Sequence, residues 1–386
     1  MSSVLVTGAR AFAALDWVRR FGRAGHRVTA CDSFQHPLCR SSRYLSHYTE
    51  VPPSRQSPVE HALAVRDAAL ACEAEWIIPT CEEIFALARY RRLFDGVSKL
   101  LAPSFESLGL LHHKGHFATW VDSLPALSIR APETRELRSR EDVAAFLASE
   151  GDPRDWVLKP AFSRFASEVL IRPSAGQAGS ITPTAEHPWL AQRFVPGRPL
   201  CTFTLAIEGR ITAHSTYEPR HRSGQGAGFF FEPVEAPELF EFCSRLVGHL
   251  NFTGQICFDF IAGPEGPRVI ECNPRTTSGI HLLAPEDPLP FLNAGCGRLW
   301  PVDPTPRMIT FAMVTEPGRS LNRWTDLMRG RDVVKPPDDR LTHVAGWQMF
   351  KELRQREKML GPGADMKAAS TFDLEWNGEP LPELPA

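Results

Sequence analysis

The sequence predicts a mixed fold, with an α/β unit first and an α+β region after it. The length of 386 residues suits two or three packed units better than a single core. The first hundred residues alternate short apolar runs with helical patterns, which is typical of a parallel sheet. From about Arg198 the chain becomes richer in strand patterns, so the second half is expected to contain most of the antiparallel structure.

The first unit, residues 1–103, reads as alternating strands and helices. The turn Thr7-Gly8-Ala9-Arg10 joins the first strand to a helix, where an anion can bind the helix N-terminus, but it is not a GxGxxG pattern. Asp32 ends the second strand and resembles the acid that binds a ribose in dinucleotide sites. Strands are expected at residues 4–6, 26–32, 76–79 and 99–102, and helices at 15–24, at 59–72 and from Glu82 onward.

The remainder divides into residues 104–197, 198–300 and 301–386. The Gly/Ser stretch 223–228 is expected to be a mobile loop, and the last residues, 379–386, are rich in proline and expected to fray. The expected strands are 156–159, 190–195, 201–207, 211–217, 255–262 and 268–272, and the expected helices are 108–121, 235–250 and 343–360.

Composition excludes several classes of protein. Hydrophobic residues make up 43% of the chain, charged residues 23%, and the net charge is -2, so no nucleic acid or anionic membrane is expected as a partner. The N-terminus lacks the pattern of a signal peptide, and no apolar run is long enough to cross a bilayer. The nine cysteines are scattered and form no CxxC pair, which favours reduced thiols in the cytoplasm.

The most informative segment is a predicted β-hairpin at residues 258–275. Glu271 and Asn273 share one face of the second strand, and Asp259 can project onto that face from the first. Two carboxylates and an amide oxygen are hard ligands that suit Mg²⁺. Pro274 ends the strand and leaves Arg275 at the rim, where a guanidinium can hold a phosphate or carboxylate oxygen.

This hairpin resembles the metal motif of the ATP-grasp superfamily, which includes biotin carboxylase, carbamoyl-phosphate synthetase and D-alanine ligase. The resemblance implies a Rossmann-like pre-ATP-grasp domain followed by a two-lobed ATP-grasp domain. It also implies ATP and Mg²⁺, or Mn²⁺ in its place, as cofactors, with Arg275 on the transferred phosphate. Residues 301–386 form a C-terminal extension of no assigned role.

Nucleotide-binding residues precede the hairpin in the order that the resemblance implies. Lys114 and Lys159 resemble the two nucleotide lysines, with Lys159 also catalytic, and the segment 192–197 resembles the hinge that clamps adenine. In that hinge, Gln192 is expected to face the adenine amino group, while the backbone of Phe194 and Val195 pairs with the base edge.

Two features depart from the family pattern. The phosphate-covering loop, normally glycine-rich, has no glycine at 160–167, so Ser163, Arg164 and Ser167 are the expected phosphate donors there. Arg198 follows the hinge glycine where many relatives have an acidic residue, which leaves the ribose contact unassigned.

Substrate residues are less well defined. Arg220 and Arg222 lie in a basic loop that either closes over a carboxylate or is simply solvated. Glu82 and Glu83 open a helix, where carboxylates either stabilise the first turn or bind a substrate amine. Ser278 and His281 follow the hairpin and are candidates for the acceptor pocket, although a lone histidine is more often structural.

The resulting hypothesis is an ATP-dependent ligase that joins a small carboxylate to an amine through an acyl phosphate and releases ADP and phosphate. Two alternatives stay open: a biotin-dependent or carbamoyl-phosphate-type carboxylase subunit, and a non-catalytic ATP-binding scaffold. The expected partners are the small-molecule carboxylate and amine and, since dimers are common in the family, a second copy of the chain.

Overall fold

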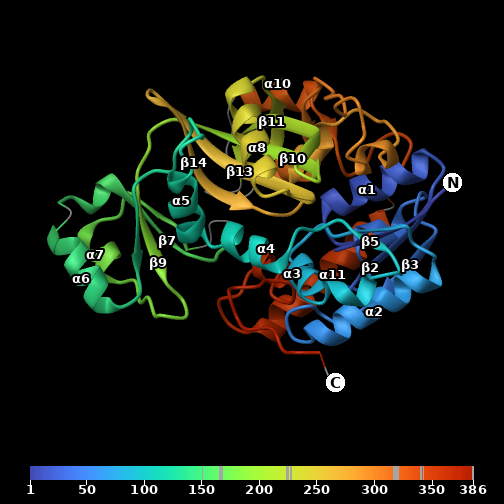
Figure 1. The fold of residues 1–386 in the computed structure, drawn as a ribbon, viewed down its shortest axis with the longest axis horizontal. Helices are drawn as coiled ribbons and strands as arrows, with labels where there is room; N and C mark the ends of the chain where they lie inside the picture. Colours follow the sequence, from blue (N-terminus) through green and yellow to red (C-terminus); the bar gives the residue numbers. More distant parts are fainter. Residues whose placement is uncertain are drawn as a thin grey trace.

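The computed structural model describes residues 1–149, 151–164, 168–222, 226, 228–315, 321–339, 341 and 343–384. An N-terminal α/β unit lies at one end, a small sheet at the other, and a large sheet between them (Figure 1). The predicted mixture of a parallel α/β unit and a strand-rich second half is confirmed. Among the described residues, no helix is both long enough and apolar enough to span a membrane.

The first sheet has five parallel strands in the order β3-β2-β1-β4-β5. Alternate side chains of β1 enter different cores, because Val4 and Val6 pack with helix α1, while Leu5 packs with α2 and α3 on the other face. The elements are β1 (Ser3–Thr7), α1 (Phe12–Arg23), β2 (Arg27–Asp32), β3 (His47–Glu50), α2 (Pro58–Ala71), β4 (Trp76–Ile78), α3 (Glu83–Arg89) and β5 (Lys99–Leu100).

The single helix predicted at 108–121 is wrong, because two helices occupy this stretch. Helix α4 (Phe105–His112) ends before His113, whose backbone is extended, and α5 (Lys114–Ser123) begins directly after it. The ring nitrogen Nδ1 of His113 accepts the backbone N–H of His116 at 3.1 Å, so His113 is the N-cap of α5. This break places Lys114 in the first turn of a new helix.

The small sheet has four antiparallel strands in the order β6-β9-β7-β8. Its core packs Leu137, Phe146 and Trp156 beneath two short helices. The elements are β6 (Thr134–Leu137), α6 (Arg140–Ser149), β7 (Trp156–Pro160), β8 (Leu170–Ile171), α7 (Ala175–Gly179) and β9 (Trp189–Arg193).

The large sheet has seven strands in the order β14-β13-β10-β11-β12-β15-β16. Helix α8 packs with β13 through Phe242 and Phe258, whose rings meet edge to face. The sheet is joined to the first unit by Gln255, which accepts from Trp17 and donates to the carbonyl of Pro79, both at 2.8 Å. The elements are β10 (Arg198–Ile207), β11 (Arg210–Arg222), β12 (Gly228–Pro233), α8 (Pro237–His249), β13 (Gly254–Gly263), β14 (Gly266–Asn273), β15 (Arg307–Met308) and β16 (Arg331–Asp332). Most of the loop expected at 223–228 lies outside the described residues, and Gly228 already belongs to β12.

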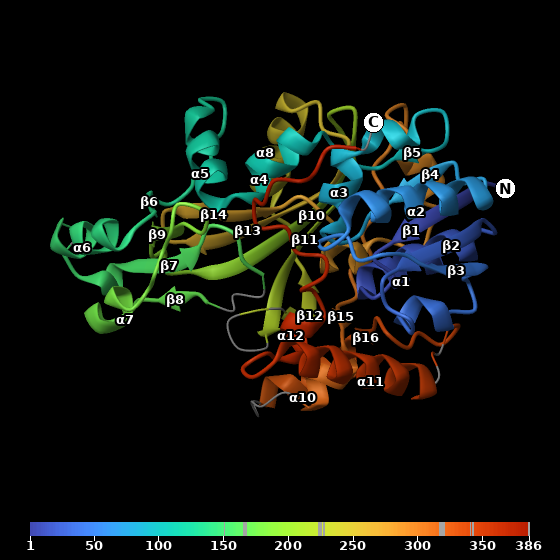
Figure 2. The same cartoon turned by 90° about the horizontal axis from the view of Figure 1, so that it is seen from below.

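The C-terminal segment returns to the first unit (Figure 2). It contains α9 (Thr310–Thr315), α10 (Leu321–Arg329), α11 (His343–Leu360), α12 (Met366–Ala369) and then a tail. The prediction that the tail frays is wrong for residues 379–384. Glu379 pairs with Arg55 at 2.8 Å, and the carbonyl of Pro382 accepts from the Tyr90 hydroxyl at 2.8 Å. Prolines set extended backbone here, and the first unit supplies the hydrogen-bonding groups.

Candidate active site

The hairpin of β13 and β14 carries the predicted metal ligands. Asp259 lies opposite Glu271 in the strand register, and Asn273 follows two residues later on the same face. The Nδ2 atom of Asn273 donates to a carboxylate oxygen of Asp259 and to one of Glu271, each at 3.3 Å. The structure therefore brings together the three oxygen-bearing side chains that the sequence places on one face.

The two carboxylates of this hairpin differ in the charges that surround them. Burial raises the pKa of Asp259, and the neighbouring Glu271 carboxylate adds to the rise. Burial opposes ionisation of Glu271 as well, but the ammonium groups of Lys114 and Lys159 outweigh it and lower its pKa. A divalent cation fits this cluster, since it would balance the charge and find oxygen ligands. To bind the cation through Oδ1, the Asn273 amide would have to rotate, because Oδ1 now accepts from Arg275 at 3.1 Å and Nδ2 faces the carboxylates.

Two buried lysines approach the hairpin from the small-sheet side. Lys159 ends β7, and its Nζ donates to Gln192 Oε1 at 2.9 Å and to the carbonyl of Ile270 at 3.0 Å. The Nζ of Lys114 lies 3.8 Å from a Glu271 oxygen and donates to the carbonyl of Ser163 at 3.1 Å. Burial lowers the pKa of Lys159 to about 8, because the charged ammonium loses hydration when it is buried.

The predicted adenine hinge is partly engaged with the protein itself. The amide of Gln192 accepts from Lys159 and donates to Thr134 Oγ1 at 3.0 Å, so it orients the lysine. The backbone N–H of Phe194 donates to the carbonyl of Asp155 at 2.8 Å, which removes that donor from the base edge. The backbone groups of the hinge that we still expect to bind adenine are the Phe194 carbonyl and those of Val195.

Glu82 lies next to the predicted metal hairpin, whereas the sequence alone allowed either a structural or a substrate-binding role for it. Its side chain is buried, and Oε1 lies 3.0 Å from Nε of Arg164 and 3.5 Å from Nε of Arg275. Its Oε2 accepts the backbone N–H of Trp376 at 3.3 Å. Burial opposes ionisation of Glu82, but Arg164, followed by His112 and Arg275, lowers its pKa. One carboxylate therefore pairs with both guanidiniums next to the hairpin and balances one of their two charges.

Glu83 has the capping role instead. Its Oε1 accepts the Thr7 hydroxyl at 2.6 Å and the backbone N–H groups of Thr80 and Cys81 at 3.0 and 3.1 Å. Through Oε1 it joins the ends of β1 and β4, whereas its buried Oε2 has no hydrogen-bond partner. These bonds support a structural role for Glu83, and its binding of a substrate amine stays a prediction.

The two arginines of the basic loop, Arg220 and Arg222, have different surroundings. Arg220 pairs with Glu232 at 3.4 Å and with Asp326 at 3.7 Å, so it ties β11 to β12 and α10. Burial and Glu271 raise the pKa of Asp259, and the Arg222 charge opposes that rise, which places Arg222 within electrostatic reach of the hairpin. Ser167, named for the covering loop, lies outside the described residues.

Of the two residues named after the hairpin, His281 is committed elsewhere. Its Nδ1 lies 2.9 Å from an oxygen of Asp16, and its ring is buried against α1, so it holds the first unit to the large sheet rather than lining the acceptor pocket. Ser278 begins the 3-10 turn η4 (Ser278–Leu282), and its role stays a prediction.

Trp376 is a further residue of the site, and the sequence does not predict it. Besides its bond to Glu82, its carbonyl accepts from Nε2 of His112 at 3.1 Å, and its ring stacks on Phe85 with centroids 4.7 Å apart. The Phe162 ring of the covering loop meets it edge to face. A lone tryptophan in a proline-rich end was the only available signal, and nothing in the sequence linked it to residues some 290 positions earlier.

Comparison with known proteins finds one family match and matches to solved structures. Residues 120–279 match a family model described as an ATP-grasp domain, and this stretch includes Lys159, the hinge and the whole metal hairpin. A search of curated proteins gives no match.

Solved structures share the fold over most of the chain. The N5-carboxyaminoimidazole synthetase of Staphylococcus aureus is 12% identical, with a TM-score of 0.57 over 79% of this chain and 80% of that one. Biotin carboxylase of Campylobacter jejuni is 14% identical, with a TM-score of 0.59 over 78% and 72% of the two chains. The L-amino acid ligase of Bacillus licheniformis is 12% identical, with a TM-score of 0.53 over 72% and 68%.

The chain thus contains a stretch, residues 120–279, that matches an ATP-grasp domain. Together with its five-stranded parallel N-terminal sheet, the chain shares its overall fold with the synthetase, the carboxylase and the ligase named above.

Proposed function

We propose that this enzyme phosphorylates a small carboxylate and transfers the acyl group to an amine, releasing ADP and phosphate. The observation that carries the proposal is the face made by Asp259, Glu271 and Asn273, opposite two buried lysines and beside Arg275. A protein that only bound ATP would have little use for two buried arginines, Arg164 and Arg275, next to that face.

The residues suit the two steps of such a reaction. A substrate carboxylate oxygen attacks the γ-phosphorus and ADP leaves; the amine then attacks the acyl carbon, phosphate leaves, and the amine loses a proton. Asp259, Glu271 and Asn273 would hold Mg²⁺, which neutralises phosphate charge when bound. Lys114 and Lys159 add fixed charge, and positioning is most of what phosphoryl transfer requires.

Arg275 and Arg164 are assigned to the carboxylate and its acyl phosphate. Both guanidiniums now rest on the Glu82 carboxylate, which has the same charge and shape as the group that they would hold. Glu82 therefore keeps them charged, buried and in place before substrate arrives.

The amine is assigned to the cavity on the other side of Glu82. This cavity of about 280 Å³ lies between the first unit and the tail. Phe85 and Trp376 give it an apolar wall, and Ser54, which also lines it, has a buried hydroxyl without a hydrogen-bond partner. Glu375 and Glu379 line it too, so acidic groups outnumber the single cation Arg55, which favours an ammonium group.

The test is ATP turnover with mixed pools of amines and small carboxylates in the presence of Mg²⁺. ADP release that needs both a carboxylate and an amine supports the ligase, whereas bicarbonate-dependent release would indicate the carboxylase alternative. ATP binding without turnover across broad pools would indicate a scaffold.

Variants of the hairpin make the same test residue-specific. Glu271→Gln should abolish turnover with little change in stability, because it removes a ligand charge and keeps the shape. Glu265→Ala in the exposed turn of the same hairpin is the matched control and should keep full activity. Full activity of Glu271→Gln would overturn the assignment.

Two further proposals concern the protein's setting. A cytoplasmic location is supported by the nine cysteines, all of which are free thiols here. A homodimer is supported by the dimer named for one structural neighbour, a 2-oxoglutarate carboxylase domain from Hydrogenobacter thermophilus.

A further inference from the structure

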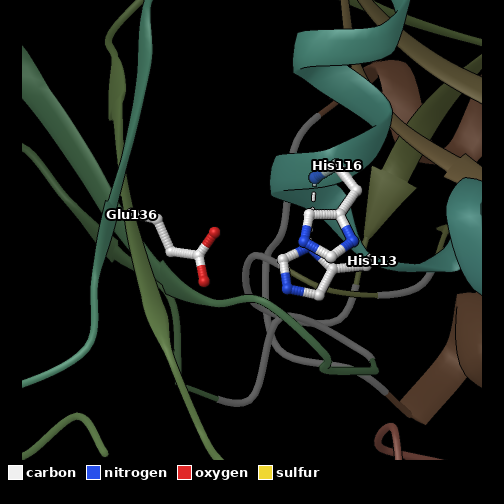
Figure 3. A group of neighbouring side chains, drawn as sticks. All are labelled: His113, His116 and Glu136. Carbon is white, nitrogen blue, oxygen red and sulfur yellow. Dashed lines mark hydrogen bonds between the residues drawn. The ribbon is translucent and has the colours of Figure 1, made fainter. Parts of the chain in front are cut away.

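A second group of potential metal ligands lies outside the hairpin. His113, His116 and Glu136 each offer one ligand atom, and these atoms lie within 4.8 Å of one another. The Glu136 carboxylate extends from β6 toward the two imidazole rings at the start of α5 (Figure 3). Tetrahedral ligand atoms around a zinc-sized ion are about 3.3 Å apart, so only small side-chain movements separate this group from coordination.

Local structure fixes this juxtaposition. His113 and His116 are three residues apart, so they share one side of the first helical turn, and their rings stack 3.7 Å apart at 13°. On β6, Glu136 shares its face with Thr134, while Leu137 points into the core of the small sheet. His113 is held by the Phe162 ring, whereas His116 is exposed and free to adjust.

The contacts that these side chains already make are weak enough to exchange. The N-cap bond of His113 is worth about 1 kcal/mol. Glu136 also pairs with Arg138 at 2.9 Å, but the arginine is 60% exposed and such surface pairs contribute about 0–1 kcal/mol. Neither contact explains why the His116 ring and the Glu136 carboxylate converge.

We propose that His113, His116 and Glu136 form a binding site for a divalent transition metal of the zinc type, with water as a fourth ligand. Two imidazole nitrogens and one carboxylate oxygen suit Zn²⁺ or Co²⁺, whereas Mg²⁺ prefers an all-oxygen set such as that of the hairpin. The two metal sites are therefore distinguished by ligand type.

The site would clamp α5 to β6, the two elements that orient the nucleotide residues. Lys114 follows His113 directly, and Thr134 of β6 accepts from Gln192, which in turn holds Lys159. A bound ion would thereby fix both lysines relative to each other. Binding of the ion itself does not depend on the proposed ligase reaction.

The experiment is a titration of tag-free, chelator-stripped protein with Zn²⁺ against a chromogenic chelator, with Mg²⁺ in excess to fill the oxygen site. One equivalent should bind, and Co²⁺ should give the visible absorption of a tetrahedral complex. His116→Ala and Glu136→Gln should each weaken binding by roughly a hundredfold or more. His187→Ala removes an exposed histidine of the same lobe and should change nothing.

Circular dichroism establishes that each variant is folded, and Glu136→Gln keeps the shape of the side chain if His116→Ala is unstable. Absence of one-to-one binding would overturn the proposal. So would equal affinity in the wild type and both site variants, or loss of binding in His187→Ala. Loss of ligase turnover without loss of Zn²⁺ binding would bear on the proposed function alone.

Discussion

Removing the Asp373 carboxylate should release the C-terminal tail and destabilise the chain. The Asp373 side chain is 2% exposed and bonds to Arg10 at 2.5 Å, to Ser33 at 2.5 Å and to Arg356 at 2.8 Å. Asp32 binds the other side of the buried Arg10, and the half-buried Arg356 also pairs with Glu352 at 3.4 Å. Asp373→Ala leaves the buried Arg10 guanidinium with one carboxylate in place of two.

The expected loss is about 3–5 kcal/mol, the usual cost of breaking one side of a buried ion pair. Burial disfavours the Asp373 charge, yet Arg10 and then Ser33 and Arg356 outweigh it and lower its pKa to about 2, which shows how strongly the ionised form is held. Asp338 is the matched control, because it pairs with Arg23 at 2.7 Å with both side chains partly exposed. Asp338→Ala should cost less than about 1 kcal/mol.

The assay is urea unfolding at neutral pH followed by circular dichroism, for the wild type and both variants. Limited proteolysis should then cut the tail of Asp373→Ala first. A double variant with Arg356→Ala should lose less than the sum of the two single losses, since the partners share one interaction. Equal midpoints for Asp373→Ala and Asp338→Ala, or strict additivity with Arg356, would refute the reasoning.

Two further predictions concern stability. Burial lowers the pKa of His112 and of His214 to about 4, so above pH 6.5 both residues are neutral in the folded and in the unfolded chain. Between pH 6.5 and 4 only the unfolded chain takes up these protons, so the free energy of unfolding should fall by up to about 1.4 kcal/mol per pH unit for each histidine. Urea unfolding across this pH range measures the slope, which His214→Gln should reduce; an unchanged slope would contradict the prediction. Gly279→Ala would place a Cβ 2.4 Å from Cβ of Phe203 and should cost about 1–3 kcal/mol, whereas Gly176→Ala meets no atom within 4 Å and should be neutral or slightly stabilising by the same measurement.

The sequence predicts the buried strands and misses the exposed ones. The runs that become β1, β2 and β4 are apolar because both faces of a parallel sheet are covered. Strand β3 (His47–Glu50) is an edge strand with half-exposed polar side chains, so it carries no apolar run and only its neighbour β2 defines it. The break at His113 was missed because the apolar residues of α4 and α5 continue one periodic pattern.

The metal hairpin could be predicted because its geometry is local. Asp259, Glu271 and Asn273 are placed by two strands and one turn, and strand alternation decides their common face. The Glu82–Arg164–Arg275 contact joins three parts of the chain that only tertiary packing brings together. Single-sequence patterns contain no information on such contacts, so the roles of Glu82 and Glu83 could not be separated.

The return of the tail to the first unit has a consequence for biosynthesis. Trp376 contacts Glu82 and His112, and Gly378 packs against Phe162 of the covering loop. Domains fold in order as they leave the ribosome, so the first unit and both lobes are complete while the residues around 376 are still being added or remain in the exit tunnel. The first unit and both lobes can therefore fold before Trp376, which lines the proposed amine cavity, is in place.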